Sequence, residues 1–281
     1  MPEREAACAL SGTMIRVVII GVSGRMGRAL VRAAVQHGEL ELTGAIARPG
    51  SAALGQDAGE LAGVDPLKLP VTADLPAALA LADVAIDFSR SEATRSILAA
   101  CQAARKPLLL GTTGWAPELG SLLDAAALDI ALLVAPNTSV GVALLTELVR
   151  IAARQLPECF DIEIIEAHHR GKRDAPSGTA VALGRAAASG RGVPEPDVGG
   201  QLRRARQGPR PPAEIGFAVV RGGDLAGEHT VLFAGEGEQL SLTHRVSDRM
   251  VFARGAVQAA LWLAHQPPGR YGMQDLLSLK Q

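Results

Sequence analysis

A short glycine motif between a strand and a helix constrains the fold of this chain more than any other feature. Residues 15–20 (IRVVII) form a β-branched, nearly continuous apolar run, which is typical of a strand buried on both faces of a parallel sheet. GVSGRMG follows, with glycines at 21, 24 and 27, and then a helical pattern runs through Val35. In that context the glycines predict a turn where a dinucleotide pyrophosphate can approach the start of a helix. The alternative is a tight turn that binds no ligand.

A repeated alternation of strands and helices follows. Strands are expected at 40–47, 82–86, 107–110 and 130–134, and alanine-rich helices at 92–104 and 117–127. This order predicts an α/β fold with a Rossmann-type doubly wound parallel sheet and right-handed crossovers. Ligands bind at the carboxyl ends of the strands in such sheets, so the polar segments that follow the strands are candidate walls of a site. These segments are Asp87–Arg90, Gly111–Gly114 and Ala135–Ser139.

The pattern changes after about residue 140. A helix is expected at 141–155, and residues 160–166 (FDIEIIE) alternate apolar and acidic side chains, as a strand with one face in water does. Similar runs predict a second, α+β domain with a mixed or antiparallel sheet; they lie at 215–220, 229–233 and 239–245. Residues 190–212 are rich in Gly, Pro and Arg and predict a long mobile loop, in which Arg203, Arg204, Arg206 and Arg210 are expected to be solvated. A helix at 250–263 is expected to return to the first domain.

These patterns divide the chain into four parts. We expect a disordered extension (1–13), a dinucleotide-binding domain (14–138), a second domain (139–248) and a C-terminal helical part (249–281). The N-terminus lacks the basic and apolar regions of a signal peptide, and no apolar run approaches the ~20 residues of a membrane span, so a cytoplasmic location is expected. The net charge of −1 and the 3% aromatic content argue against nucleic-acid and membrane-surface partners.

The end of the second predicted strand bears on the choice of cofactor. A carboxylate at this position, about 20 residues after the glycine turn, would bind the ribose hydroxyls of NAD. The sequence has Ala47 and Arg48 there instead, and an arginine can pair with the additional phosphate of NADP. We therefore expect NADPH to be preferred and NADH to remain possible. The alternative is that Arg48 is a solvated cation.

The densest chemistry lies in EAHHRGKRDAPSGTA, residues 166–180. Ser177, Gly178 and Thr179 open a predicted helix, whose positive end offers N–H and hydroxyl donors to a carboxylate. His168 and Lys172 can deliver protons. Adjacent histidines on a strand point to opposite faces, so a shared metal ion is not expected. A lone histidine would more often be a structural imidazole, but this grouping favours a functional site.

Arg249 is expected to begin the last helix, where its charge opposes the helix dipole. That position suggests contact with an anionic ligand, and the alternative is an ion pair between domains.

Taken together, GVSGRMG, DFS at 87, GTTG at 111, NTSVGV at 137 and above all EAHHRGKRDAPSGTA resemble the dihydrodipicolinate reductase family of bacterial lysine and diaminopimelate synthesis. The resemblance extends from about Ile15 to the C-terminus. It implies an oxidoreductase that transfers hydride from NAD(P)H to a cyclic dicarboxylic imine, with loss of water. It also implies a homotetramer whose second domain forms the central assembly.

The resemblance implies roles for individual residues. His168 would be the proton donor or acceptor and Lys172 the general acid. Substrate would be bound by His169, Ser177, Gly178, Thr179 and Arg249. The glycine turn would bind the pyrophosphate, and residues after the later strands would line the nicotinamide. The expected cofactor-binding residues are Gly21, Val22, Ser23, Gly24, Arg25, Met26, Gly27, Arg48, Phe88, Arg90, Gly111, Thr112, Thr113, Ala135, Pro136, Asn137 and Thr138.

Two other functions stay open at this point. One is a different NADP-dependent dehydrogenase of amino-acid intermediates, acting for example on aspartate semialdehyde, homoserine or diaminopimelate. An acylating semialdehyde dehydrogenase would need a nucleophilic cysteine, and Cys159 is expected just before a strand, away from any histidine-rich turn. The other is a non-catalytic regulator that senses NADP(H), which would have little reason to keep His168, His169 and Lys172 beside the helix start.

Overall fold

The computed structural model describes residues 14–115, 118–195, 210–211 and 213–277. The expected extension (1–13), most of the expected loop (190–212) and the arginines at 203, 204 and 206 lie outside these ranges. The chain forms two compact units. One contains the residues up to Ala135 together with Ala253–Gly272, and the other contains Pro136–Phe252 and the residues from Met273 on.

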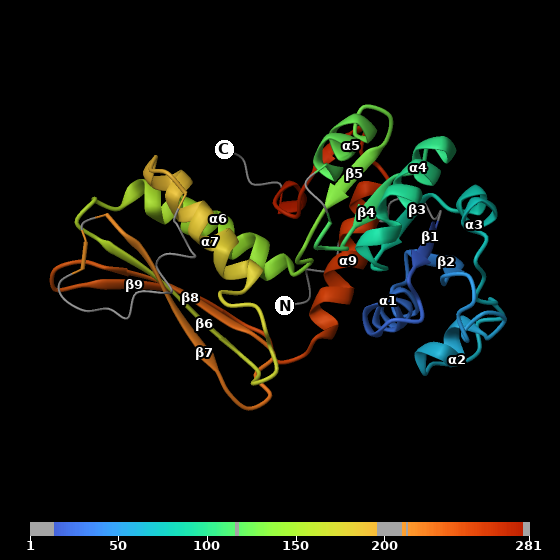
Figure 1. The fold of residues 1–281 in the computed structure, drawn as a ribbon, viewed down its shortest axis with the longest axis horizontal. Helices are drawn as coiled ribbons and strands as arrows, with labels where there is room; N and C mark the ends of the chain where they lie inside the picture. Colours follow the sequence, from blue (N-terminus) through green and yellow to red (C-terminus); the bar gives the residue numbers. More distant parts are fainter. Residues whose placement is uncertain (1–13, 116–117, 196–209, 212, 278–281) are drawn as a thin grey trace, which may run out of the picture. The chain divides into compact units, whose positions relative to one another are not determined.

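The first unit is built on a six-stranded sheet (Figure 1). Its order is β10-β5-β4-β3-β1-β2, and all neighbours are parallel. The strands are β1 (Ile15–Ile20), β2 (Leu40–Ile46), β3 (Val84–Asp87), β4 (Leu108–Leu110), β5 (Ala131–Val134) and β10 (Gly269–Tyr271). The predicted Rossmann-type α/β fold is therefore confirmed.

The order of the strands reverses at β1. From β1 the chain first moves to β2 on one side, and later strands build outward from β3 on the other side. The carboxyl ends of β1 and β3 therefore meet at the topological switch point, where open α/β sheets bind their ligands. The glycine turn follows β1, and Phe88, Ser89 and Arg90 follow β3.

Helices cover both faces of this sheet. In Figure 1, α3 (Leu75–Leu81), α4 (Thr94–Ala104) and α5 (Leu119–Ala126) lie on one face, and α1 (Arg25–Val35) and α9 (Met250–Leu263) on the other. The first face has a continuous apolar core to which Val18, Ile97 and Leu123 contribute. Two shorter helices, α2 (Ala58–Ala62) and η1 (Ser91–Ala93), complete the unit before β10.

The sixth strand, β10, is absent from our sequence prediction. It has three residues, Gly-Arg-Tyr, and follows two prolines. So short a segment carries no periodic pattern, and only its pairing with β5 at the sheet edge makes it a strand.

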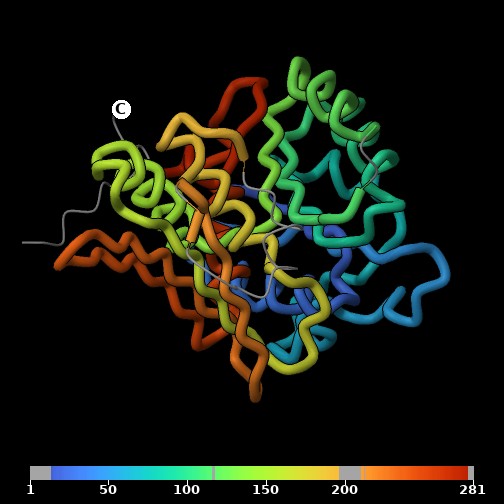
Figure 2. Tube along the Cα trace, turned by 60° about the vertical axis from the view of Figure 1, so that its left-hand side comes forward, coloured from blue at the N-terminus to red at the C-terminus, as the bar shows by residue number. Residues whose placement is uncertain are grey.

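The second unit has a mixed four-stranded sheet in the order β7-β6-β8-β9. Its strands are β6 (Asp161–His168), β7 (Ile215–Arg221), β8 (Glu228–Ala234) and β9 (Gln239–Arg245). β6 is parallel to β7 and antiparallel to β8, and β8 is antiparallel to β9. Figure 2 shows this sheet from a second direction.

Two long helices, α6 (Val140–Gln155) and α7 (Gly178–Arg191), pack side by side on one face of that sheet (Figure 1). The core between helices and sheet includes Val149, Leu183, Ile164 and Phe233, all shielded from water. A 3₁₀ turn, η2 (Asp275–Leu277), contacts α6. Ser139 caps α6 by accepting a hydrogen bond from Val142 N–H at 3.3 Å.

Arg210 differs from its expected solvated state. Its side chain is 17% exposed and forms ion pairs with Asp161 and Glu163 of β6. It also donates to the carbonyl oxygen of Ile162 at 2.8 Å. Arg210 is therefore attached to the sheet through β6.

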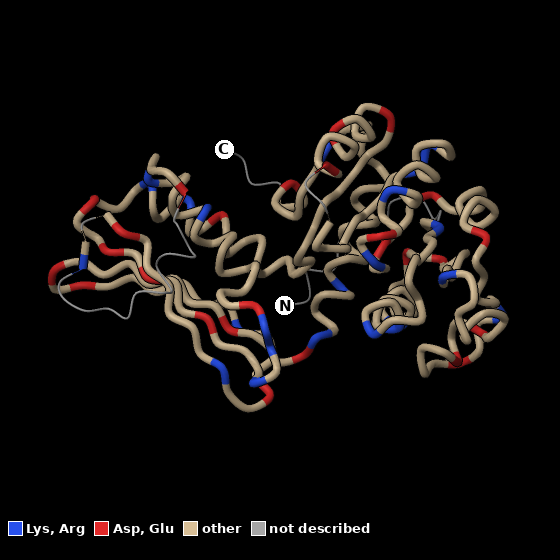
Figure 3. The backbone as a smooth tube through the Cα atoms, in the orientation of Figure 1, with Lys and Arg blue, Asp and Glu red and all other residues tan. Residues whose placement is uncertain are grey.

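No helix among the described residues is long and apolar enough to cross a membrane. Positive and negative residues are interspersed along both units (Figure 3).

Candidate active site

The glycine turn of the first unit leaves its backbone open to a ligand. A Cβ on Gly27 would lie 2.2 Å from the carbonyl oxygen of Gly21, so only glycine lets α1 start this close to β1. Gly21 itself has a φ of +91°, a left-handed conformation that favours glycine. Gly24 is the N-cap of α1 and has no side chain to satisfy the first-turn N–H groups. The turn therefore presents free donors at the positive end of a helix.

An open pocket of about 420 Å³ lies beside this turn, in the same unit. Its lining comes from the ends of β3 and β4: Phe88, Ser89, Arg90, Ser91, Glu92, Gly111, Thr112 and Thr113. Five of these residues are among the expected cofactor-binding residues.

A buried carboxylate holds this pocket together. Asp87, at the end of β3, has no exposed surface. It accepts hydrogen bonds from Ser89 N–H at 2.8 Å and from the Thr112 hydroxyl at 3.2 Å. Burial raises the pKa of Asp87, and the hydrogen bonds from Ser89 and Thr112 oppose that rise. Asp87 thus joins the loops after β3 and β4.

The end of β2 carries the expected selectivity residues. Ala47 is buried, and the exposed Arg48 begins a turn in which Ser51 N–H donates to the Arg48 carbonyl at 3.1 Å. The Arg48 side chain is therefore free of the core.

The second unit brings the histidine-rich segment onto the helix-covered face of its sheet. Along β6, the side chains of Ile162, Ile164, Glu166 and His168 alternate with more exposed neighbours and are 3%, 0%, 1% and 8% exposed. The strand register places Arg221 of β7 beside His168, and His229 of β8 beside Glu166. A polar layer therefore continues the apolar core at the end of β6.

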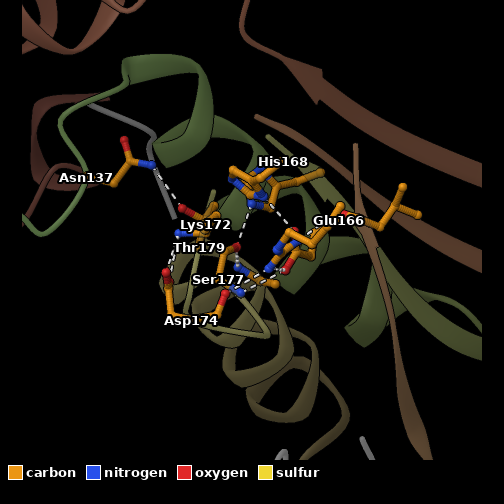
Figure 4. A network of polar contacts seen from close by, with 11 residues as sticks. Asn137, Glu166, His168, Lys172, Asp174, Ser177 and Thr179 are labelled. Carbon is orange, nitrogen blue, oxygen red and sulfur yellow. Dashed lines mark hydrogen bonds and ion pairs between the residues drawn. The ribbon is translucent and has the colours of Figure 1, made fainter. Parts of the chain in front are cut away.

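Glu166 is the centre of this layer (Figure 4). One carboxylate oxygen, Oε2, contacts His168 Nδ1 at 2.5 Å and accepts from Arg221 at 2.7 Å. The other, Oε1, accepts from Arg221 at 2.8 Å and from Ser177 N–H at 3.0 Å. Burial alone would raise the pKa of Glu166, but these hydrogen bonds outweigh it and lower the pKa.

Two histidines meet edge to face in the layer. The ring centroids of His168 and His229 are 5.0 Å apart. Burial, followed by the nearby charge of His168, lowers the pKa of His229 to about 4, so His229 is neutral near pH 7. Burial also lowers the pKa of His168, and the Glu166 carboxylate opposes that effect.

Ser177 connects this layer to the start of α7. Its hydroxyl caps the helix by accepting from Ala180 N–H at 3.1 Å and lies 2.8 Å from His229 Nε2. Gly178 and Thr179 follow as first-turn residues, whose N–H groups have no partner within the helix. Thr179 Oγ1 accepts from the Asn137 side chain at 3.0 Å, which leaves its hydroxyl hydrogen available (Figure 4). This helix start is suited to bind a carboxylate.

Lys172 lies in the loop between β6 and α7. Its Nζ forms an ion pair with Asp174, at 2.7 Å and 2.9 Å from the two carboxylate oxygens (Figure 4). The pair lowers the pKa of Asp174. Asp174 is mostly exposed, with 59% of its side chain in water, so its hold on Lys172 is that of a surface ion pair and can be exchanged for a ligand carboxylate.

Other expected site residues are less closely grouped. His169 is partly buried just after β6, and Arg249 is exposed before α9. Thr138 is 1% exposed and donates its hydroxyl to the Phe252 carbonyl at 2.6 Å.

Comparison with known proteins decides the family. The model for the N-terminal part of dihydrodipicolinate reductase matches residues 15–138, and the model for its C-terminal part matches residues 141–277. The chain belongs to the dihydrodipicolinate reductase family. This confirms the resemblance seen in the sequence. The chain is an oxidoreductase with a pyridine-nucleotide-binding fold.

Relatives agree with this assignment over nearly the whole chain. The 4-hydroxy-tetrahydrodipicolinate reductase of Alkalilimnicola ehrlichii is 53% identical over 94% of this chain and 99% of its own length. That of an Anaeromyxobacter species is 50% identical over 95% and 99%. A dipicolinate-bound dihydrodipicolinate reductase from Paenisporosarcina sp. TG-14 is 27% identical, with a TM-score of 0.75 and coverage of 94% of this chain and 99% of that one.

Sequence reasoning missed four residues at these two sites: Asp87 as the support of the pocket, and Glu166, Arg221 and His229 in the polar layer. Asp87 and Glu166 lie within the motifs DFS and EAHHRGKRDAPSGTA, but no sequence pattern indicated that their carboxylates would be buried. Arg221 and His229 lie on distant strands, and only the register brings them to His168.

Proposed function

We propose that this chain reduces 4-hydroxy-tetrahydrodipicolinate to tetrahydrodipicolinate with NAD(P)H, in lysine synthesis through diaminopimelate. One hydride and one proton are added to the substrate ring, and its hydroxyl leaves as water. The observation that carries the proposal is the grouping of two proton donors, His168 and Lys172, with the carboxylate-binding start of α7. A ring that bears two carboxylates needs that combination of donors and positive helix end.

The first unit fits the cofactor. The close approach of α1 to β1 at Gly27 and the uncapped first turn suit a pyrophosphate. Gly21–Gly27 would hold the phosphates, and Phe88, Arg90, Gly111, Thr112, Thr113 and Ala135 would surround the rest. When bound, the reduced nicotinamide supplies the hydride. The first unit thus serves the cofactor in this proposal, and the second unit serves the substrate.

The second unit binds and protonates the substrate. Gly178 and Thr179 would hold one carboxylate through their N–H groups and the Thr179 hydroxyl, with His169 and Arg249 as further partners and Ser177 holding the helix start in position. Lys172 would exchange Asp174 for the substrate. Hydride addition builds electron density on the ring nitrogen, which Lys172 or His168 relieves by donating a proton, an effect worth ~10²–10⁴-fold in rate.

The same site distinguishes a reductase from an NADP(H) sensor. We expect pyridine-2,6-dicarboxylate, a planar analogue of the substrate, to inhibit turnover competitively against the substrate. Replacing Thr179 with valine removes the hydroxyl and should weaken this inhibition about 10-fold. Inhibition constants measured at several substrate concentrations check both points. A protein that binds NADPH but ignores the dicarboxylate contradicts the proposal.

Arg48 supports a preference for NADPH. Its exposed guanidinium at the end of β2 is available to the additional phosphate, and the neighbouring Ala47 offers no carboxylate to the ribose hydroxyls of NADH. We expect Arg48→Ser to lower kcat/KM for NADPH by at least about 10-fold and to leave the NADH value within about 2-fold, since a charged phosphate contact contributes about 1.5–3 kcal/mol. An equal loss of kcat/KM with both cofactors would show that Arg48 does not bind the additional phosphate.

The open face of the second sheet supports the expected homotetramer. α6 and α7 cover one face, and the other face carries exposed apolar side chains, among them Ile165 at 37% and Val220 at 49%. Ile165 pairs with Ala218 and Ala167 pairs with Val220 across β6 and β7, so the apolar surface is continuous there. Such a face is stabilised by burial against another copy of the chain.

A further inference from the structure

We propose that Glu166 is a positioning residue of this active site: it fixes the tautomer of His168 and the position of the start of α7 with a single carboxylate. The inference rests on the proposed reductase function and deepens it, because it assigns the atom of His168 that exchanges the proton. Glu166 itself does not touch the substrate.

The contacts of Glu166 define which nitrogen of His168 carries hydrogen. The carboxylate can only accept, and its Oε2 lies 2.5 Å from His168 Nδ1. Nδ1 must therefore be the donor in neutral and charged His168 alike. Nε2 is left as the atom that takes and gives a proton.

The surroundings of Nε2 agree with that assignment. Gly227, between β7 and β8, has a φ of +149°, and a Cβ built on it would lie 3.1 Å from His168 Nε2. A side chain at 227 would crowd this nitrogen, so the glycine leaves space beside Nε2.

Arg221 keeps Glu166 ionised. It donates to both carboxylate oxygens, and its second terminal nitrogen also donates to the Asp174 carbonyl at 2.8 Å. A buried carboxylate without such a partner would take up a proton and could donate to Nδ1, which would reverse the tautomer.

The same carboxylate holds the substrate end of α7. Its Oε1 accepts from Ser177 N–H at 3.0 Å, and the Ser177 hydroxyl caps the helix. One carboxylate thereby holds both His168 and the N–H groups at the start of α7 in position. Small displacements of such groups cost rate, because catalysis depends on alignment.

Five charged or titratable groups lie around His168 and the neighbouring His229. Glu166 and Lys172 come from β6 and the loop after it, Arg221 from β7, His229 from β8, and His244 of β9 lies beyond His229. Glu166 stabilises the imidazolium, whereas Lys172 and Arg221 oppose it. His229, with a pKa of about 4, carries no charge in the working range. Loss of the Glu166 charge therefore lowers the pKa of His168.

The test combines kinetics with NMR on Glu166→Gln, and Glu163→Gln serves as the matched control because Glu163 lies on the same strand with the opposite orientation. If protonated His168 donates the proton, kcat is lost as pH rises through its pKa. We expect Glu166→Gln to lower kcat roughly 10- to 100-fold, to move this basic limb to lower pH by about one unit, and to leave the Kd for NADPH unchanged. Glu163→Gln should keep the wild-type pH dependence of kcat.

The NMR arm does not depend on turnover. In ¹⁵N-histidine-labelled wild-type protein, with His168 assigned by comparison with His168→Gln, neutral His168 should carry its hydrogen on Nδ1. Hydrogen on Nε2 overturns the proposal even if Glu166→Gln does not fold. A Glu166→Gln enzyme with reduced kcat but an unmoved limb also overturns it. Inactive wild-type protein with an Nδ1-protonated His168 refutes the reductase and leaves the tautomer assignment standing.

Discussion

Replacing Lys172 with methionine is expected to lower kcat by roughly 10²–10⁴-fold while the Kd for NADPH stays within about 2-fold. Methionine keeps the length and apolar stem of lysine but has neither charge nor proton. Lys172 lies in the loop before α7, and its ion pair with the exposed Asp174 leaves the ammonium available to an anionic substrate. The glycine turn belongs to the other unit, so cofactor affinity should not change. Steady-state kinetics and titration of NADPH fluorescence measure the two quantities.

Arg173→Met is the matched control for Lys172→Met. Arg173 is exposed in the same loop, and its replacement removes the same charge. If the loss came only from the overall charge of the loop, both variants would slow the enzyme equally. A Lys172→Met enzyme with kcat near the wild-type value would remove Lys172 from the mechanism.

Replacing Gly27 with alanine should abolish useful cofactor binding. The added Cβ would lie 2.2 Å from the Gly21 carbonyl oxygen and 2.6 Å from the Val22 Cα, and both are backbone atoms that cannot turn away. The start of α1 must then move from β1, which disrupts the turn that we propose as the phosphate site. We expect the Kd for NADPH to rise at least about 100-fold and the free energy of unfolding to fall by about 1–3 kcal/mol, the usual effect of overpacking.

Gly38→Ala provides the control for Gly27→Ala. Gly38 follows α1, and an added Cβ would meet no atom within 4 Å. This variant should bind NADPH normally and unfold within about 1 kcal/mol of the wild type. Calorimetric titration and thermal unfolding compare the two. Normal NADPH affinity in Gly27→Ala would show that the turn is not the phosphate site.

Local patterns were enough to predict five of the six strands of the first unit, but not β10 or the short helices α2 and α3. The apolar run at 15–20, the glycines after it and the recurring strands all reflect burial and backbone geometry that adjacent residues determine. β10 escaped prediction because three residues between a double proline and a glycine become a strand only through their partner, β5.

The polar layer shows why the second site could be predicted only in part. The motif at 166–180 pointed to His168, Lys172 and the helix start as candidates, since those residues are close together in the chain. The sequence predicted a strand whose acidic residues face water. The strand alternates regularly, but Ile164 and Ile165 are consecutive, so Ile165 takes the outward position and Glu166 the inward one. Arg221 and His229 lie more than 50 residues away, and strand register alone brings them to it.

The proposed reduction can be tested by NADPH oxidation on substrate made in situ from pyruvate and aspartate semialdehyde by the preceding synthase, with NADH in a parallel reaction. We expect oxidation that depends on both precursors and on the synthase, and that is faster with NADPH. Folded protein that binds NADPH but oxidises neither cofactor under these conditions would contradict the proposed reduction.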